Sequence, residues 1–201
     1  LDHFALYWAR FALLGLAEVP AFALRTRRWD LLAPALLGEA AYVATVWAAW
    51  RSAPLPTFYV FLLPFMVTSL AAMFGNWSQH IFVDPARPRD DYALTYDVID
   101  HPDNQKTFND GYHIEHHANS QAHWSELPQR FLDSQHRHAA KDSLVFRGLN
   151  VFEVGLLCMT GRLGTLADHY VNVGQPKRTR EELVQLMRER LRPVGRGGAA
   201  R

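Results

Sequence analysis

Apolar residues are concentrated in the first third of the chain, and polar residues dominate after them. Residues 54–75 carry no charged side chain over 22 positions, and about 20 apolar residues are enough for a helix to cross a bilayer. Residues 31–50 form a second apolar run that is interrupted only by Glu39. Because three residues separate the two runs, we predict an antiparallel hairpin of membrane-spanning helices, with Pro64 kinking the second helix.

The segment before this hairpin, residues 4–24, is apolar but contains Arg10 and Glu18. Such a helix can cross the membrane or lie in the interface with its charges in water, and an ordinary buried helix has the same pattern. We favour the interfacial position, because the hairpin by itself returns the chain to the side on which it began.

Three patterns describe the chain beyond the hairpin. Proline-containing dipeptides predict an irregular loop over residues 84–110. Residues 144–166, which are apolar but broken by charges and glycines, predict a helix packed on other helices or on the membrane surface. Thr179 and Glu182 form a capping box that predicts a short charged helix ending near Leu191, and the terminal sequence GRGGAAR predicts disorder.

Basic residues are distributed unequally around the hairpin. Arg25, Arg27 and Arg28 precede it, whereas Arg51 is the only basic residue in its turn. The positive-inside rule places the three arginines on the cytosolic side. The segment that follows residue 75 therefore faces the cytosol as well.

Net charge and cysteine content give no support for a nucleic-acid partner or for a disulfide within the chain. The formal net charge is +1, which is too small to indicate a nucleic-acid partner. Cys158 is the only cysteine in the sequence, so an intrachain disulfide is impossible.

Histidines provide the candidate chemistry. His113, His116 and His117 occupy positions i, i+3 and i+4, which share one face of a helix. Three imidazoles on one helical turn repel one another when protonated, and a metal ion relieves this repulsion because neutral imidazole is a common ligand of zinc, copper, iron and nickel. Asn76 and His80 lie one turn apart where the second spanning helix ends, and His80 is thus a further candidate ligand at the membrane surface.

The fold class predicted from these patterns is all-α. We expect an integral membrane helical bundle with a cytosolic helical cap that carries histidine metal ligands. The expected parts of this single domain are a membrane hairpin at about residues 31–75, a metal-binding cap at about 76–170 and a polar tail at 171–201.

The arrangement resembles the membrane fatty acid desaturase superfamily. An HxxHH motif at residues 113–117 follows an NxxxH motif at residues 76–80, which lies at the cytosolic end of a membrane hairpin. The likeness covers roughly residues 31–128 and agrees in motif, order and topology. It implies a non-haem di-iron centre that is held almost wholly by histidines, activates dioxygen and removes hydrogens from a fatty acyl chain.

The resemblance also implies roles for individual residues. The expected iron ligands are the three residues of the third histidine box and the histidine that precedes it: His113, His116, His117 and His80. Asn76 corresponds to an amide that holds a metal-bound water, and Asp110 to a carboxylate that orients a ligand histidine through its second ring nitrogen. His123 is expected to support a ligand or line the acyl entry. Glu115 receives no role.

The sequence departs from the family pattern in one large respect. The two earlier histidine boxes, HxxxH and HxxHH, are missing, and His3 is the only histidine before His80. A di-iron site needs ligands from all three boxes, so these residues supply about half a site. We expect that the chain is a piece of a longer protein that has lost its N-terminal part, and that without the other boxes it has no desaturase activity.

The resemblance implies partners and a location. The substrate is expected to be a fatty acyl lipid or an acyl-CoA, with dioxygen as the oxidant and the membrane lipid as the surroundings. Electrons must come from a separate cytochrome b5 or ferredoxin, because the HPGG haem motif of cytochrome b5 is absent: Asp103 and Asn104 follow His101-Pro102. The expected location is a multi-pass membrane position with the metal site facing the cytosol, in the endoplasmic reticulum membrane if the source is eukaryotic.

Three other functions compete with acyl desaturation. A membrane di-iron lipid hydroxylase shares the same site plan, and an inactive membrane pseudoenzyme explains the missing boxes. A zinc hydrolase fits three histidines, but the order His-Ile-Glu-His-His contains neither HExxH nor HxxEH. Of the remaining histidines, His101, His136 and His138 are expected to be solvated.

Overall fold

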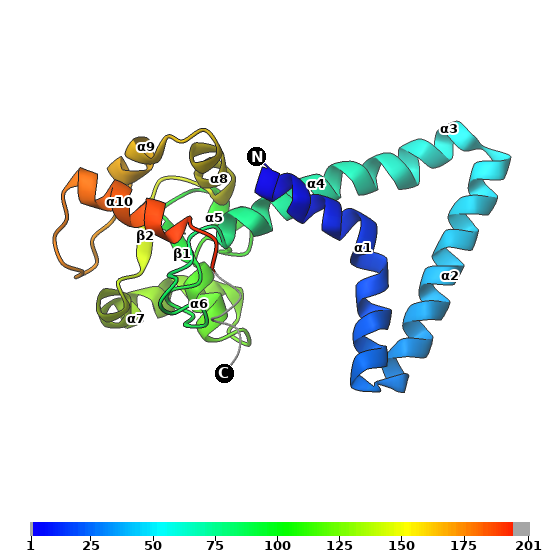
Figure 1. The fold of residues 1–201 in the computed structure, drawn as a ribbon, viewed down its shortest axis with the longest axis horizontal. Helices are drawn as coiled ribbons and strands as arrows, with labels where there is room; N and C mark the ends of the chain where they lie inside the picture. The colour runs from blue at the N-terminus through cyan, green and yellow to red at the C-terminus, as the bar shows by residue number, and fades with distance from the viewer. Residues whose placement is uncertain (1, 195–201) are drawn as a thin grey trace. The chain divides into compact units, whose positions relative to one another are not determined.

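A computed structural model describes residues 2–194 of the chain, so the disorder expected for GRGGAAR lies outside the described residues. The described part is mostly helical, as the sequence predicts, and contains three apolar helices of membrane length. The chain divides into two compact units, Leu1–Phe74 and Gly75–Arg201. Figure 1 follows the elements of both units along the chain.

The first unit consists of long apolar helices. Its elements are α1 (Asp2–Thr26), α2 (Trp29–Ser52), α3 (Pro54–Thr57), the π-helical segment η1 (Phe58–Leu62) and the part of α4 (Leu63–Gln79) that ends at Phe74. The last three are continuous, and the candidate spans are His3–Thr26, Trp29–Ser52 and Pro54–Gln79. Both helices of the predicted hairpin are therefore present. Within the described residues α2 has no buried side chain, which is expected of a helix whose apolar surface faces lipid.

The structure changes the interpretation of residues 4–24. They belong to a 24-residue apolar helix that meets the length and composition of a membrane span, whereas the sequence favoured an interfacial helix. Its two charges pair with each other, with Arg10 Nη2 lying 3.0 Å from Glu18 Oε1, and such pairing lowers the cost of charges at membrane depth. The indole of Trp8 also donates a hydrogen bond of 3.3 Å to Ser69 Oγ of α4.

A wide helical turn precedes Pro64. Pro64 has no N–H to donate to the carbonyl four residues earlier. In the residue before it, the amide of Leu63 donates to the carbonyl of Phe58, five residues back, which is the π-helical pattern. Such π-helical turns are a recognised cause of irregularity in long helices. The structure thus has a π-helical segment just before the proline at which the sequence predicted a kink.

The second unit mixes short helices with a small sheet. After the end of α4 its elements are β1 (Tyr96–Ile99), α5 (Asp103–Lys106), α6 (His113–Ala118), η2 (Trp124–Glu126), α7 (Leu127–Lys141), β2 (Leu144–Arg147), α8 (Val151–Met159), α9 (Leu163–Asp168) and α10 (Arg180–Arg190). The strands β1 and β2 pair in parallel, with Tyr96 opposite Leu144 and Ile99 opposite Arg147.

Two sequence expectations are corrected by this sheet. Residues 84–110 are not wholly irregular, because they contain β1 and α5, and residues 144–166 begin with a strand and continue as two helices. A strand of only four residues has too few positions to be distinguished from a helix by periodicity. The pairing of β1 with β2 joins segments that are far apart in the sequence, so no local pattern reports it.

The core of the second unit forms around the sheet. Its fully buried side chains include Phe82, Tyr96, Phe146 and Leu166. The helix predicted from Thr179 is confirmed as α10, with both hydrogen bonds of the capping box present. Met187 of α10 is buried in the same core.

Candidate metal centre

The helix that carries the HxxHH motif begins where the chain passes close to β1. The amide of Val98 donates to the carbonyl of Gly111 over 2.8 Å. A Cβ at Gly111 would collide with the Val98 carbonyl and the Asn104 side chain, so only glycine allows this approach. The six residues of α6 follow directly, starting at His113.

His80 reaches the same place from another element. It follows the last residue of α4, and its Nε2 lies 3.3 Å from Nε2 of His113. The rings of His80 and His117 have centroids 5.0 Å apart. One ligand atom from each of His80, His113 and His117 falls within 4.8 Å of the others. The structure thus brings together three of the four predicted ligands.

The fourth predicted ligand, His116, lies beside this group and is exposed. Its ring centroid is 5.7 Å from that of His113 and 5.8 Å from that of His117. It is not a member of the three-histidine group.

Burial lowers the pKa of two of these imidazoles, His80 and His117, and so favours their neutral, metal-binding form. Burial and, after it, the charge of His113 lower the pKa of His80. Burial together with the neighbouring histidines lowers the pKa of His117 to about 4. Both rings are therefore neutral at physiological pH, and neutral imidazole is the form that binds metals.

Asp110 and Gln79 contact His113 at Nδ1, on the side of the ring that faces away from His80. Asp110 Oδ1 lies 3.4 Å from Nδ1 of His113, the ring nitrogen opposite the one that faces His80. Gln79 Nε2 donates a hydrogen bond of 2.6 Å to Asp110 Oδ2 and lies 3.3 Å from the same Nδ1. Burial acts to raise the pKa of Asp110, but its hydrogen bonds and the charge of His113 outweigh burial and hold that pKa below the usual value.

Asp110 was predicted from the sequence as a supporting residue, but Gln79 was not. Gln79 is buried at the end of α4, and its carbonyl accepts a hydrogen bond of 2.5 Å from Thr95 Oγ1. The available signal was a glutamine directly before His80 in a helix otherwise rich in apolar residues. Its contact with Asp110 spans 31 residues, so the sequence alone did not show what it touches.

Two predicted supporting residues lie outside the group of three. Asn76 is exposed on α4, one turn before His80. His123 is exposed and caps η2, where its Nδ1 lies 2.8 Å from Ser125 Oγ and accepts from the Ser125 amide over 3.4 Å. The structure therefore gives His123 a local role at a helix start.

One histidine expected to be solvated is buried. His138 has no exposed surface, because it lies on the inner face of α7 with ring centroids 5.1 Å from Tyr92 and 5.0 Å from Phe131. It joins Asp97 and Glu115 in a second group of possible ligand atoms. His136 is exposed, as predicted, whereas His101 is half-buried.

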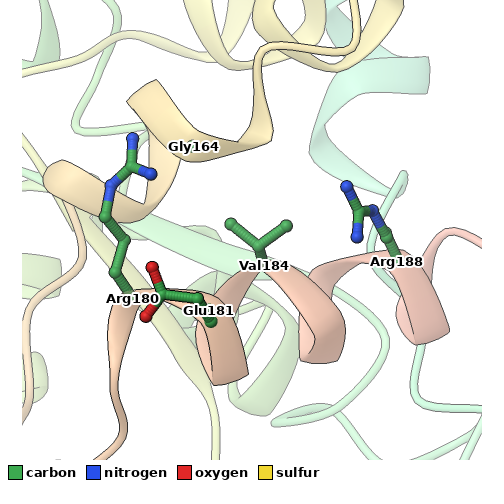
Figure 2. Close-up of a pocket in the computed structure, with 5 residues that line it drawn as sticks. All are labelled: Gly164, Arg180, Glu181, Val184 and Arg188. Carbon is green, nitrogen blue, oxygen red and sulfur yellow. The ribbon is translucent and has the colours of Figure 1, made fainter.

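A pocket of about 290 Å³ lies elsewhere in the second unit. It is lined by Gly164, Arg180, Glu181, Val184 and Arg188, of α9 and α10 (Figure 2). The Arg180 guanidinium packs over Gly164 and pairs with Asp168, with Nε and Oδ1 2.6 Å apart. This pocket contains none of the predicted metal ligands.

The residues present fit a metal ion held by imidazoles. Three converging histidine nitrogens satisfy the minimum protein ligand set of a catalytic metal site with open positions. Asp110 beside Nδ1 of His113 supplies the supporting carboxylate that such ligands usually have. Among the described residues these donors suffice for one ion, and His116 is the nearest further imidazole.

The fold and this cluster define a multi-pass helical membrane protein with a histidine site suited to a metal. Residues 1–147 match the family model described as fatty acid desaturase. This chain belongs to the fatty acid desaturase family. Membership implies an oxidoreductase with a fatty acyl substrate. No curated protein and no solved structure gave a significant match.

Proposed function

We propose that this chain is part of a fatty acyl desaturase domain and provides the third-box half of a dioxygen-dependent, non-haem di-iron centre. The observation that carries the proposal is the convergence of His80, His113 and His117 within 4.8 Å at the end of a membrane-length helix. Together with family membership, it supports iron as the metal. His116 completes the proposed ligand set.

The residues of the chain hold and orient the site. His80, His113 and His117 bind the metal as neutral rings, since burial lowers the pKa of His80 and His117. The Asp110 carboxylate lies at Nδ1 of His113, where it stabilises a ring N–H and so leaves Nε2 free for the metal, and Gln79 donates a hydrogen bond that holds that carboxylate in place. When bound, the iron pair activates dioxygen for removal of hydrogens from an unactivated acyl C–H pair.

The membrane helices support the proposed orientation of the metal site. Candidate spans end at Thr26 and Gln79, and the three arginines near the first of these ends support a cytosolic position for the metal site. The proposed substrates are acyl lipids or acyl-CoA, and the electron donor is a separate cytochrome b5 or ferredoxin. In the proposed division of the domain, the cap covers about residues 76–170 and a polar segment covers 171–201, whose helix α10 packs on the core of the second unit.

A complementation assay of the full-length parent protein tests the proposal. The parent is expressed in a desaturase-deficient host, and fatty acid methyl esters are profiled. We expect His113→Ala and His117→Ala to abolish double-bond formation while membrane insertion is retained, because ligand number sets metal binding. His136→Ala, an exposed histidine outside the cluster, is the matched control. Unsaturated product from either ligand variant at the level of the control would contradict the proposal.

Metal analysis separates this proposal from its competitors. Iron bound by the parent in a histidine-dependent manner supports the oxygenase class, and hydroxylated rather than unsaturated acyl chains would indicate the hydroxylase. One zinc per chain without iron would favour the hydrolase. Host growth unaffected by loss of His113 and His117 would indicate a pseudoenzyme.

A further inference from the structure

Three ionisable side chains meet in the interior of the second unit on the far side of α6 from the histidine cluster. Asp97 comes from β1, Glu115 from α6 and His138 from α7. The side chains of Asp97 and His138 are 0% exposed, and that of Glu115 is 6% exposed. Groups of this kind are rarely buried unless they are paired, so their meeting requires an explanation.

Hydrogen bonds connect these groups to α6, the helix that carries the HxxHH motif, and to its neighbours. Asp97 Oδ1 accepts from the amide of Ile114 over 2.8 Å. Glu115 Oε1 accepts from Ser134 Oγ over 2.5 Å and lies 2.9 Å from His138 Nε2. The carboxylates thus tie α6 to β1 on one side and to α7 on the other.

The helix α6 needs such hydrogen bonds to other elements. It has six residues, and Tyr112 at its N-cap position provides no side-chain cap. An isolated helix of that length is unstable in water, and an orphan amide in its first turn needs an acceptor. Asp97, from another element, supplies that acceptor at Ile114. The orientation of α6 is therefore set by its contacts with β1 and α7.

Glu115 and the cluster lie on different faces of the same turn. At about 100° per residue, Glu115 points roughly opposite to His113 and His117, which are two residues away on each side. Any movement of Glu115, which is held by Ser134 and His138, therefore rotates or translates the imidazoles of α6. Metal ligands tolerate errors of only a few tenths of an ångström.

We propose that Asp97, Glu115 and His138 form a buried network that positions the helix bearing His113, His116 and His117, and that they are positioning residues of the metal site. This inference rests on the proposed function, since it takes those histidines as the metal ligands. Within the network, Glu115 Oε1 lies 2.9 Å from His138 Nε2, and the His138 ring makes edge contacts with Tyr92 and Phe131.

A second interpretation of the three groups is a metal site of their own. Among the described residues, Asp97 Oδ2 and His138 Nδ1 have no hydrogen-bond partner. However, His138 Nε2 is already engaged by Glu115 at 2.9 Å and lies 3.8 Å from Asp97 Oδ2. We therefore favour positioning, and the experiment below distinguishes the two.

The test titrates the purified 201-residue chain with Co²⁺ as a spectroscopic probe. Ser134→Ala removes one hydrogen bond to Glu115, Glu115→Ala removes the whole anchor, and Glu115→Gln retains an acceptor oxygen. We expect Glu115→Ala to weaken Co²⁺ binding roughly 10- to 100-fold and to change the visible spectrum, as supporting groups of metal ligands do. Ser134→Ala and Glu115→Gln should give smaller losses. Glu126→Gln, an exposed carboxylate of η2, should bind as wild type.

Amide hydrogen exchange of the metal-free chain gives an independent readout, which also serves if Glu115→Ala does not fold. We expect faster exchange within α6 in Ser134→Ala and Glu115→Gln, with exchange in α10 unchanged. Wild-type affinity and wild-type α6 exchange in these two variants would overturn the inference. So would a bound ion that survives His113→Ala but is lost in His138→Gln, since the three groups would then be ligands. Absence of any His113-dependent Co²⁺ site would instead defeat the proposed function, and the exchange data would still decide the positioning.

Discussion

His80 Nε2 lies 3.3 Å from His113 Nε2, although 33 residues separate the two histidines in the sequence. The first follows the end of a membrane-length helix and the second begins α6. Their contact makes the end of the candidate span one wall of the candidate metal centre.

His80 is therefore expected to be a ligand as important as the residues of the HxxHH motif. We predict that His80→Ala lowers the affinity of the chain for Fe²⁺ or Co²⁺ at least tenfold, because one of three convergent imidazoles is lost. Competition with a chromophoric chelator measures the affinity. His123→Ala, whose side chain bonds locally to Ser125, should leave it unchanged, and equal affinities of the two variants would contradict the assignment.

Asp110 is expected to act on the metal through His113. We predict that Asp110→Asn weakens metal binding roughly 10- to 100-fold, the usual cost of losing a carboxylate behind a ligand histidine. The neutral amide no longer stabilises a proton at His113 Nδ1. Isothermal titration with Co²⁺ checks this prediction. Asp133→Asn, an exposed carboxylate of α7, is the control, and an Asp110→Asn affinity equal to that of Asp133→Asn would rule out the role.

Asp97 makes stability depend on pH. Burial raises its pKa to about 7, against about 3.9 in an unfolded chain. The folded state therefore binds this proton more tightly, so the resulting stabilisation is complete below about pH 4 and is lost as the pH rises through about 7. The change amounts to about 4 kcal/mol.

The Asp97→Asn variant isolates this effect. Its side chain stays neutral at every pH and retains an oxygen for the Ile114 amide. We expect the fall in melting temperature between pH 5 and pH 8 to be smaller in Asp97→Asn than in wild type. Thermal unfolding in detergent at both pH values, with Glu126→Gln as control, measures it. An identical fall in wild type and Asp97→Asn would show that Asp97 does not titrate in this range.

Gly111 is expected to be required for the approach of α6 to β1. A methyl group at this position meets the Val98 carbonyl and the Asn104 side chain, and the hydrogen bond from Asn104 Nδ2 to that carbonyl resists their withdrawal. We predict that Gly111→Ala destabilises the chain by roughly 1–3 kcal/mol, seen as a lower melting temperature. Gly38→Ala, where nothing lies within 4 Å of the added carbon, should not destabilise. Equal melting temperatures of the two variants would show that the segment relaxes freely.

Much of the helical part of this protein follows from local patterns. Two candidate spans were recognisable because apolar runs of 20 residues or more with at most one charge have few alternatives to crossing a membrane. The capping box at Thr179 located α10 because both of its hydrogen bonds form within four residues. The same logic applies to His113, His116 and His117, whose shared face is a property of a single helical turn.

The features missed by the sequence analysis are contacts between distant segments. Residues 4–24 were expected at the interface because the hairpin alone returns the chain to its starting side, and the contact of Trp8 with Ser69, 61 residues away, became visible only in the structure. Gln79 meets Asp110 across 31 residues. His138, with polar neighbours in sequence, was expected in solvent, yet its side of α7 packs against Tyr92.

The sequence by itself determined the two helices of the hairpin, the histidine motif and the resemblance to the family, because each depends on residues that are neighbours along the chain. Only the tertiary structure decided that His80 joins His113 and His117, that β1 pairs with β2, and that Asp97, Glu115 and His138 share one buried site. The physical reason is that packing brings together groups from separate elements, and burial then sets their charge and hydrogen bonding. Periodicity within one element carries no record of either.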